Sequence, residues 1–409
     1  MPRLDTIRTN EDRAAVIRAT SHAFGGTLPA TGEWIANAGE SNFRVLREGG
    51  HTPERAVASL TRIPMGLFVG PGVCASVPLI GIAAVAVAPE NRGKGYAREL
   101  MRSCVLDNAE EGVPLVGLYA STQTLYRQVG FEQAGYMCKY TVPLSRIDVR
   151  QPGRPRGEGW TITPIGEPLM PAVRECYRRF ASVQNGMLDR GPYIWNRVLN
   201  FRGVPYHGFA FSRGGAGSIE AYVFLNQDRQ PDGRQNISLT DFVFLNEDAG
   251  RRALAFLADY EMMGHDLQFN GGPTHPAMFL LGQQRFKAVV HERSYLRIAH
   301  AARAIEYRVF PKGLSATLTL TLRDDIVQAN NGEWTLSIEG GRGTLTKGSE
   351  DAAVVPRLSA DIRGLAAMYS GFKSAAELSL LGLASGEPEA LDTASSIFAA
   401  PTPAQTDMY

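Results

Sequence analysis

The stretch Leu79–Arg98 reads LIGIAAVAVAPENRGKGYAR and decides the fold of the surrounding domain. Its first nine residues, Leu79–Val87, are apolar throughout, as is typical of a central strand covered on both faces. A glycine-containing turn follows, and apolar residues at helical spacing predict a helix over Tyr96–Glu110. Strand, turn and amphipathic helix in this order indicate an α/β domain, with the turn as the place to look for a ligand.

The turn itself is suited to phosphate. Gly93 and Gly95 let backbone N–H groups converge, the helix start adds free donors, and Arg92 and Lys94 add positive charge. The alternative is an ordinary tight turn, which needs glycine anyway. Two known phosphate motifs do not fit: a Walker loop requires Ser or Thr where Gly95 stands, and a dinucleotide fingerprint requires a small residue where Arg98 stands.

Working outward, short elements surround this unit. Asn10 is the expected cap of a first helix, Gly130 is expected in the left-handed conformation that ends a helix, and Cys74, Cys104, Cys138 and Cys176 are expected to be buried thiols. The other expected elements are strands at 56–61, 65–69, 114–119 and 131–142 and a short helix at 121–129.

Further along, the pattern divides the chain. Residues 148–159 have linker composition, and a second α/β segment spans 160–298. Within it, a strand at 237–245 and a helix at 250–260 repeat the order of residues 79–110, offset by roughly 160 residues. The third segment, 299–409, holds strands at 316–322, 333–338 and 342–346, helices at 359–369 and 373–381, and a proline-rich tail.

Composition agrees with several soluble domains. The chain has 409 residues, 44% apolar and 20% charged, and a net charge of +1, which gives no argument for nucleic acid or an anionic membrane. No cysteine or histidine cluster has metal-ligand spacing. Residues 63–89 carry no charge, but their prolines and glycines would break a membrane helix. The charged N-terminus is unlike a secretory signal, so a reducing cytoplasm is expected.

Arg92, Gly95 and Ala97 fit the Arg-x-x-Gly-x-Ala signature, and the chain here resembles the GCN5-related N-acetyltransferases. Over nearly its whole length it resembles the enhanced-intracellular-survival (Eis) family, through VAVAPENRGKG, LYASTQTLYRQVGF, AAMYSGFKSAAEL and the short aromatic-ended tail. The resemblance implies an α/β (α+β) fold: a GNAT acetyltransferase domain at 1–147, a linker at 148–159, a second GNAT-like domain at 160–298, and a sterol-carrier-protein-like domain at 299–409.

The resemblance also implies residue roles. Tyr126 would be the general acid and the C-terminal carboxylate of Tyr409 the general base. The expected acetyl-CoA ligands are the backbone groups of Val85, Ala86 and Val87 for the pantetheine arm, Arg92, Gly93, Lys94, Gly95, Tyr96, Ala97 and Arg98 for the pyrophosphate, and Ser121 and Thr122 along the cofactor. No metal is expected.

The chemistry is reasonable on its own terms. A phenol of pKa near 10 protonates a departing thiolate of thiol pKa about 8.5 only when it is well placed. A terminal carboxylate is a weak base for an ammonium, so desolvation or a relaying water would have to help, and the carboxylate could equally serve to attract a cationic substrate. The alternatives are that Tyr126 only covers the core, that Tyr409 is a frayed end, and that Asp407 is either a contact for a cationic amine or a solvated acid.

The expected function is therefore a cytoplasmic, acetyl-CoA-dependent N-acetyltransferase, working by direct attack in a ternary complex. By resemblance its acceptors are aminoglycoside, polyamine or lysine amines, and the protein is a homo-hexamer. The second copy has Glu247 and Asp248 where the first has its basic turn, so one cofactor site per chain is expected. The alternative function is non-enzymatic lipid or sterol binding by the third segment.

Overall fold

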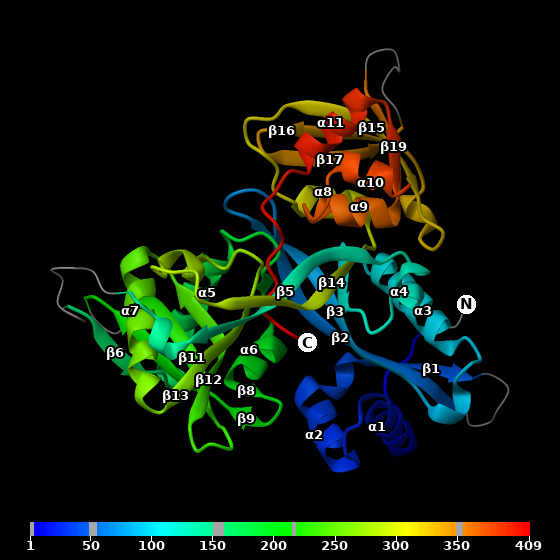
Figure 1. Cartoon of the computed structure of the whole chain (residues 1–409). Helices are drawn as coiled ribbons and strands as arrows, with labels where there is room; N and C mark the ends of the chain where they lie inside the picture. Colours follow the sequence, from blue (N-terminus) through cyan, green and yellow to red (C-terminus); the bar gives the residue numbers. More distant parts are fainter. Residues whose placement is uncertain (1–3, 49–54, 150–158, 215–217, 349–354) are drawn as a thin grey trace. The chain divides into compact units, whose positions relative to one another are not determined.

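The computed structural model describes residues 4–48, 55–149, 159–214, 218–348 and 355–409. The chain divides into two compact units (Figure 1). The first comprises residues 1–134, 293–401 and 409, and the second comprises residues 135–292 and 402–408. The linker predicted at 148–159 lies mostly outside the described residues, which resume at Gly159.

The first unit contains a mixed sheet in the order β1-β2-β3-β4-β14. β3 and β4 are parallel, and the other neighbours within this unit are antiparallel. Side chains alternate between the faces of a strand, so Ile80, Ile82, Val116 and Leu118 face α3 in the core, while Gly81 and Gly117 lie on the opposite face. The elements are α1 (Asn10–Phe24), α2 (Leu28–Ala38), β1 (Phe43–Glu48), β2 (Arg55–Val69), β3 (Ala75–Val87), α3 (Tyr96–Glu110), β4 (Leu115–Tyr119), α4 (Gln123–Arg127) and β14 (Lys287–Ile298).

Several predicted elements of this unit are confirmed. α3 has the predicted bounds, and Leu100, Met101, Cys104 and Val105 are buried along its inner stripe. Two details were wrong. The cap of α1 is Thr9 rather than Asn10, because Thr9 and Asp12 bond each other's backbone amides in a capping box. The strands predicted at 56–61 and 65–69 form one strand, β2, which continues through Pro64.

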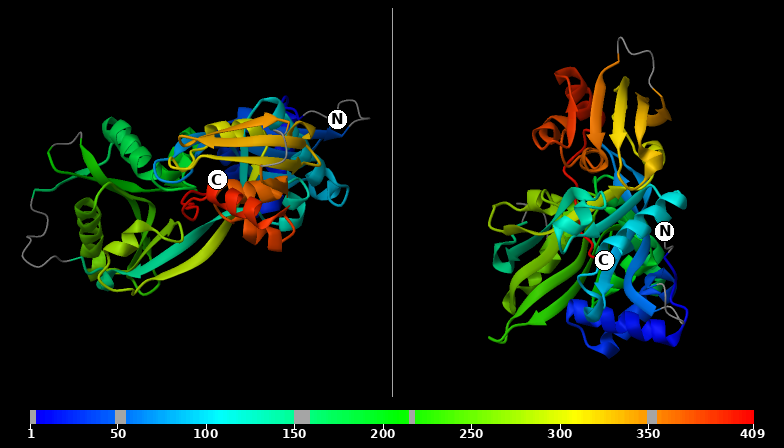
Figure 2. Two further views of the ribbon diagram at one scale, coloured as in Figure 1. Left: turned by 90° about the horizontal axis from the view of Figure 1, so that it is seen from above. Right: turned by 90° about the vertical axis from the view of Figure 1, so that its right-hand side faces the viewer.

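The third segment forms a separate sheet in the order β17-β16-β15-β18-β19. The views of Figure 2 show its strands as one layer, with the orange and red helices on one side. Residues 359–361, predicted as helix, belong to β18, and the helix begins after the Asp361 cap. The elements are α8 (Ala301–Tyr307), β15 (Ala316–Arg323), β16 (Gly332–Glu339), β17 (Arg342–Lys347), β18 (Arg357–Asp361), α9 (Ile362–Tyr369), α10 (Ala375–Leu380), β19 (Ala384–Gly386) and α11 (Pro388–Ile397).

The second unit repeats the architecture of the first. Its sheet runs β5-β13-β12-β11-β10-β6, and β12 and β13 are its parallel pair, joined through α7. The elements are β5 (Glu132–Pro143), β6 (Thr161–Pro164), α5 (Met170–Ala181), β7 (Leu188–Asp189), α6 (Pro192–Leu199), β8 (Asn200–Phe201), β9 (Val204–Pro205), β10 (His207–Ser212), β11 (Ile219–Arg229), β12 (Gln235–Phe244), α7 (Glu247–Ala258) and β13 (Gly264–Gly271). The internal repeat predicted from β12 and α7 is therefore present.

The prediction that the four cysteines are buried thiols is confirmed. All four cysteines are free and buried, and burial raises the pKa of Cys104 and of Cys176 to about 12. Among the described residues, no helix is both long and apolar enough to cross a bilayer.

Candidate active site

The β3–α3 turn presents unsatisfied backbone donors. Gly93 and Gly95 have φ of 79° and 86°, a conformation that other residues adopt only with strain. Gly95 is the N-cap of α3 and supplies no side-chain cap, so the first amides of the helix point outward without an intrahelical acceptor. A Cβ on either glycine would meet nothing within 4 Å, which shows that the space over the turn is open. This geometry fits a pyrophosphate.

The charged side chains around the turn also favour binding of an anion. Arg92 and Arg98 are exposed, and the one acid of the turn, Glu90, is held 2.9 Å from Arg18 and 3.0 Å from Arg55. Lys94 donates to the Asn91 side chain at 3.1 Å. The local potential is therefore positive, as an anion requires.

Two of the expected ligands would contribute backbone only. The Tyr96 hydroxyl donates to Glu48 at 2.5 Å and is turned away from the helix start, and Ala97 has no polar side chain. Their amides nevertheless belong to the open first turn of α3.

β3 separates from its parallel neighbour just before this turn. The β3–β4 ladder ends at the pair Ile82–Leu118, whereas β3 continues along β2 to Val87. Ala84 has φ of 51° at this point, and the β2–β3 register shifts, which marks a bulge. Val85, Ala86 and Val87 therefore lie along an edge that β4 leaves unpaired. Such an edge can hydrogen-bond an extended amide chain such as pantetheine.

Tyr126 lies in α4 and is 4% exposed. Its ring packs edge-on against Phe131, with centroids 6.2 Å apart, and it belongs to the same core cluster as Val85 and Val87. Burial raises the pKa of its phenol, and a hydrogen bond with Ser121 acts in the opposite direction. Because its pKa is raised, the phenol remains protonated at neutral pH, as a proton donor must. Ser121 and Thr122, at the start of this segment, are exposed.

Tyr409 is packed rather than frayed, so that alternative is wrong. Its ring centroid lies 5.2 Å from that of Tyr119. A Cβ on Gly81 would come within 2.8 Å of the Tyr409 ring, and one on Gly117 within 2.9 Å of its hydroxyl oxygen. Gly81 and Gly117 are direct partners in the β3–β4 ladder, so together they form a seat for the ring. Sequence analysis missed both, because a glycine in a strand gives no sign of what lies over it.

Of the two alternatives left open for Asp407, the solvated acid is wrong. Asp407 is 6% exposed, and its carboxylate lies 2.8 Å from the Arg190 guanidinium. It is a buried ion-pair partner that also lines a cavity of about 410 Å³.

The corresponding turn in the second unit is closed. Asn246 caps α7 by accepting from the Ala249 amide at 2.9 Å, and Glu247 and Asp248 occupy the first turn. Leu280 covers the helix start: a Cβ on Gly250 would be 2.5 Å from the Leu280 side chain. Capping, negative charge and close packing all disfavour a pyrophosphate there.

The opening between β12 and β13 is likewise filled, by aromatic rings. Their parallel ladder ends at the pair Ser238–Gln268. The His275 ring lies beyond it, 5.0 Å from Phe269 and 6.0 Å from Phe242 between centroids. Burial lowers the pKa of His275 to about 3, so the imidazole is neutral.

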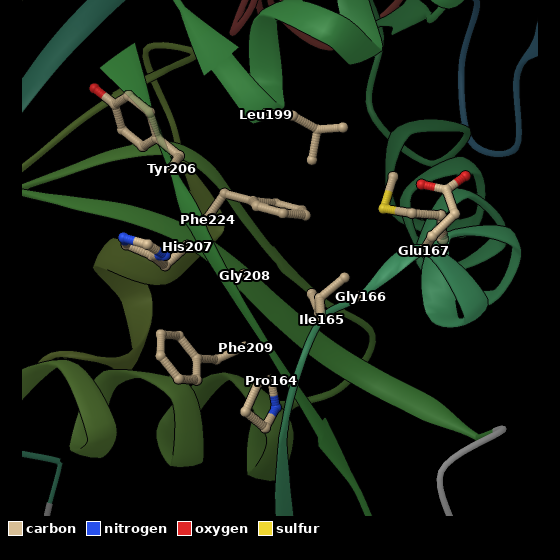
Figure 3. A pocket seen from close by; sticks show the side chains of 11 residues that line it. Pro164, Ile165, Gly166, Glu167, Leu199, Tyr206, His207, Gly208, Phe209 and Phe224 are labelled. Atoms are coloured by element: carbon tan, nitrogen blue, oxygen red, sulfur yellow. The ribbon is translucent and has the colours of Figure 1, made fainter.

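Two cavities of the second unit were not predicted. One, of about 410 Å³, lies beside the end of the β12–β13 ladder and next to Thr406–Met408, and its lining carries Lys139, Arg197 and Arg202 besides Glu292 and Asp407. The other, of about 390 Å³, has both polar and apolar groups on its wall, and Figure 3 shows Leu199 and Phe224 there with Glu167 opposite. Within the described residues, no group of three metal-ligating side chains forms a metal site.

Comparison with known protein families identifies three domains. Two acetyltransferase (GNAT) domain families match residues 7–134 and 186–298, and a sterol carrier protein domain family matches residues 301–405.

Several relatives match most of the chain. An uncharacterized N-acetyltransferase of Streptomyces avermitilis is 25% identical over 79% of this chain and 80% of its own length. The N-acetyltransferase Eis of Mycobacterium tuberculosis is 24% identical over 88% of each chain. The crystal structure of a GCN5-related N-acetyltransferase from Anabaena variabilis covers 100% of both chains with 27% identity and a TM-score of 0.89. The chain is thus an acyltransferase made of two GNAT acetyltransferase domains and a sterol carrier protein domain, and it is a homologue of the Eis N-acetyltransferases.

Proposed function

We propose that the protein transfers the acetyl group of acetyl-CoA to the amine of a small molecule or a lysine side chain, with one cofactor site per chain. The observation that carries this proposal is the β3–α3 turn, with its uncapped helix start, left-handed glycines and exposed arginines. We place the pyrophosphate on Arg92–Arg98 and the pantetheine arm along Val85–Val87. Ser121 and Thr122 line the cofactor at the end of β4.

The reaction is a direct aminolysis. The amine nitrogen attacks the thioester carbonyl carbon, the C–S bond breaks, and backbone N–H groups of the unpaired β3 edge stabilise the charge on the carbonyl oxygen. Tyr126 gives its phenolic proton to the leaving thiolate, and its hydrogen bond with Ser121 stabilises the resulting phenolate. The α-carboxylate of Tyr409 accepts the proton of the amine, directly or through a water.

We further propose the domain bounds 1–147, 160–298 and 299–409, with a catalytically silent second GNAT domain. Aminoglycoside, polyamine and lysine amines are the acceptors to be tested, in a cytoplasmic homo-hexamer, as the resemblance to the Eis family implies. The lipid-binding alternative is not favoured, because Leu318, Leu320, Leu336 and Leu358 of the third sheet are all buried in its own core.

A thiol-release assay with acetyl-CoA and a panel of these amines tests the proposal. We expect turnover with at least one class, and the acetylated nitrogen is then identified by mass spectrometry. Folded protein that binds acetyl-CoA yet releases no thiol with any class of amine would contradict the acceptor assignment, whereas failure to bind acetyl-CoA would contradict the site.

A further inference from the structure

The helix that carries Tyr126 is too short to hold its own position. α4 has five residues and no side-chain cap at its start, and an isolated helix of this length is not stable in water. The Tyr126 carbonyl accepts hydrogen bonds from the amides of Val129 and Phe131, both at 3.1 Å, so the turn after the helix folds back onto Tyr126 itself. The place of the Tyr126 side chain therefore depends on what holds this turn.

The side chain of Arg297, in β14, binds this turn and is 0% exposed. Its Nε donates to the Val129 carbonyl at 3.0 Å, and its Nη1 donates to the Ile298 carbonyl at 2.6 Å. Gly130 has φ of 85°, and a Cβ there would be 2.6 Å from the Arg297 Nε. Glycine at this position thus permits both the left-handed turn and the close approach of the guanidinium.

The guanidinium is in turn fixed by Asp324, which follows β15 in the sterol carrier protein domain. The Arg297 Nη2 donates to both carboxylate oxygens at 2.7 and 2.8 Å, and Asp324 is 1% exposed. The same carboxylate accepts from the amides of Ile326 and Val327, both at 3.0 Å, and from the Asn330 side chain at 2.9 Å. A buried ion pair adds little net stability, but the planar guanidinium that it fixes aims the Nε donor in one direction.

The sterol carrier protein domain also packs against Tyr126. Ile326 and Val327 are 8% and 5% exposed and belong to the core cluster that contains Tyr126. Ile362, the first residue of α9, would be 3.0 Å from a Cβ on Gly130. This domain therefore holds the surroundings of Tyr126 both by charge and by apolar packing.

We propose that Arg297 and Asp324 are positioning residues for Tyr126, and that the sterol carrier protein domain serves the reaction by fixing this side chain. All of these residues lie in the first unit. A displacement of about 1 Å can lower a rate about 100-fold, so the attachment of so short a helix matters to turnover. The inference rests on the proposed role of Tyr126 where activity is concerned, whereas the attachment of the turn can be measured without any acceptor.

The experiment compares Arg297→Lys with the parent by hydrogen–deuterium exchange and by steady-state kinetics. Lysine keeps the positive charge but lacks the planar fork of donors that reaches Asp324 and the Val129 carbonyl together. We expect the amides of Val129 and Phe131 to exchange at least about tenfold faster, as a weakened local structure predicts. We expect kcat to fall about tenfold while the Kd for acetyl-CoA and the KM for the acceptor stay unchanged, because a misplaced proton donor affects the chemical step rather than binding.

Arg308→Lys is the matched control. Arg308 is 2% exposed and likewise donates to three backbone carbonyls, none of which belongs to the turn after α4. It should lower the melting temperature as Arg297→Lys does, and it should leave kcat and the exchange of the Val129 and Phe131 amides at parent values.

Val327→Ala is a second variant in case Arg297→Lys does not fold, since it removes two buried methyl groups and no charge. It should raise the exchange of the same amides and lower kcat by a smaller factor. Parent-like exchange in both variants would overturn the proposal, and so would faster exchange with a parent-like kcat while Tyr126→Phe still lowers kcat. A parent-like kcat of Tyr126→Phe would contradict the proposed function instead, and the exchange rates would still decide whether Arg297 holds the turn.

Discussion

The two GNAT domains use the same strand–turn–helix unit in opposite ways. In the first, β3 leads through two left-handed glycines to the uncapped start of α3, and the strand edge beside it is left unpaired. In the second, Asn246 caps α7, Leu280 covers it, and His275 fills the opening between the strands. A ligand site in this fold therefore depends on which backbone groups are left unsatisfied and which openings are left unfilled, since the fold itself is present in both copies.

The largest expected effect is on turnover, when the proposed proton donor of the first GNAT domain is removed. Tyr126→Phe should lower kcat by about 100-fold or more, the usual contribution of a positioned proton donor, with little change in acetyl-CoA affinity. The segment over α7, Pro276–Leu280, holds no tyrosine, so the second copy offers no substitute. Steady-state kinetics and calorimetry on the same preparation measure both quantities; parent-like kcat would remove Tyr126 from the mechanism.

The next effect concerns the turns themselves. Replacing both Arg92 by Gln and Gly95 by Ala should weaken acetyl-CoA binding by about 30-fold, because a charge-assisted hydrogen bond is lost and a left-handed backbone is strained. The matched change in the second copy, Asn246→Ala with Glu247→Gln, should destabilise α7 and leave the affinity unchanged. Equal loss of acetyl-CoA affinity in both double variants would contradict the assignment of the cofactor site to the first GNAT domain.

The two GNAT domains also differ in what lies over a glycine in their central strands. A Cβ on Gly117 of β4 would meet the Tyr409 hydroxyl at 2.9 Å, whereas one on Gly271 of β13 would meet His275 at 2.7 Å. Gly117→Ala should therefore lower kcat about tenfold through displacement of Tyr409, with a small effect on stability. Gly271→Ala should lower the melting temperature and leave the kcat of the folded protein unchanged.

The smallest effect is a pH dependence of stability in the second unit. The pKa of His275 is lowered to about 3 in the folded state, so below pH 6.5 the unfolded chain binds a proton that the native protein does not. This group therefore contributes nothing to the pH dependence above its unfolded pKa. As pH falls from 6.5 towards 3, it costs about 1.4 kcal/mol of stability per pH unit. Denaturant unfolding between pH 7 and 5 should show a shallower dependence of stability on pH for His275→Phe than for the parent, and a dependence as steep as the parent's would contradict a buried neutral imidazole.

The sequence predicted what depends on neighbouring residues. The bounds of α3 and the left-handed Gly130 follow from local spacing and turn chemistry, and both were confirmed. The cap at Thr9 and the strand at 359–361 were missed, because the first depends on a reciprocal pair of hydrogen bonds and the second on pairing with β15.

The candidate site also has features that the sequence predicted and features that it did not. The β3–α3 turn was visible as a motif, but the seat of Tyr409 and the Arg190–Asp407 pair were not, since the latter joins residues 217 positions apart. No local pattern in the tail indicates which of its side chains are buried.

The most direct test of the account is the number of acetyl-CoA sites per chain, measured by titration calorimetry on the full-length protein. We expect one site in the parent and in the double variant Asn246→Ala with Glu247→Gln, and a much weaker site when Arg92 and Gly95 are changed. Two sites in the parent, or a single site that survives the change of Arg92 and Gly95 but not that of Asn246 and Glu247, would contradict the account.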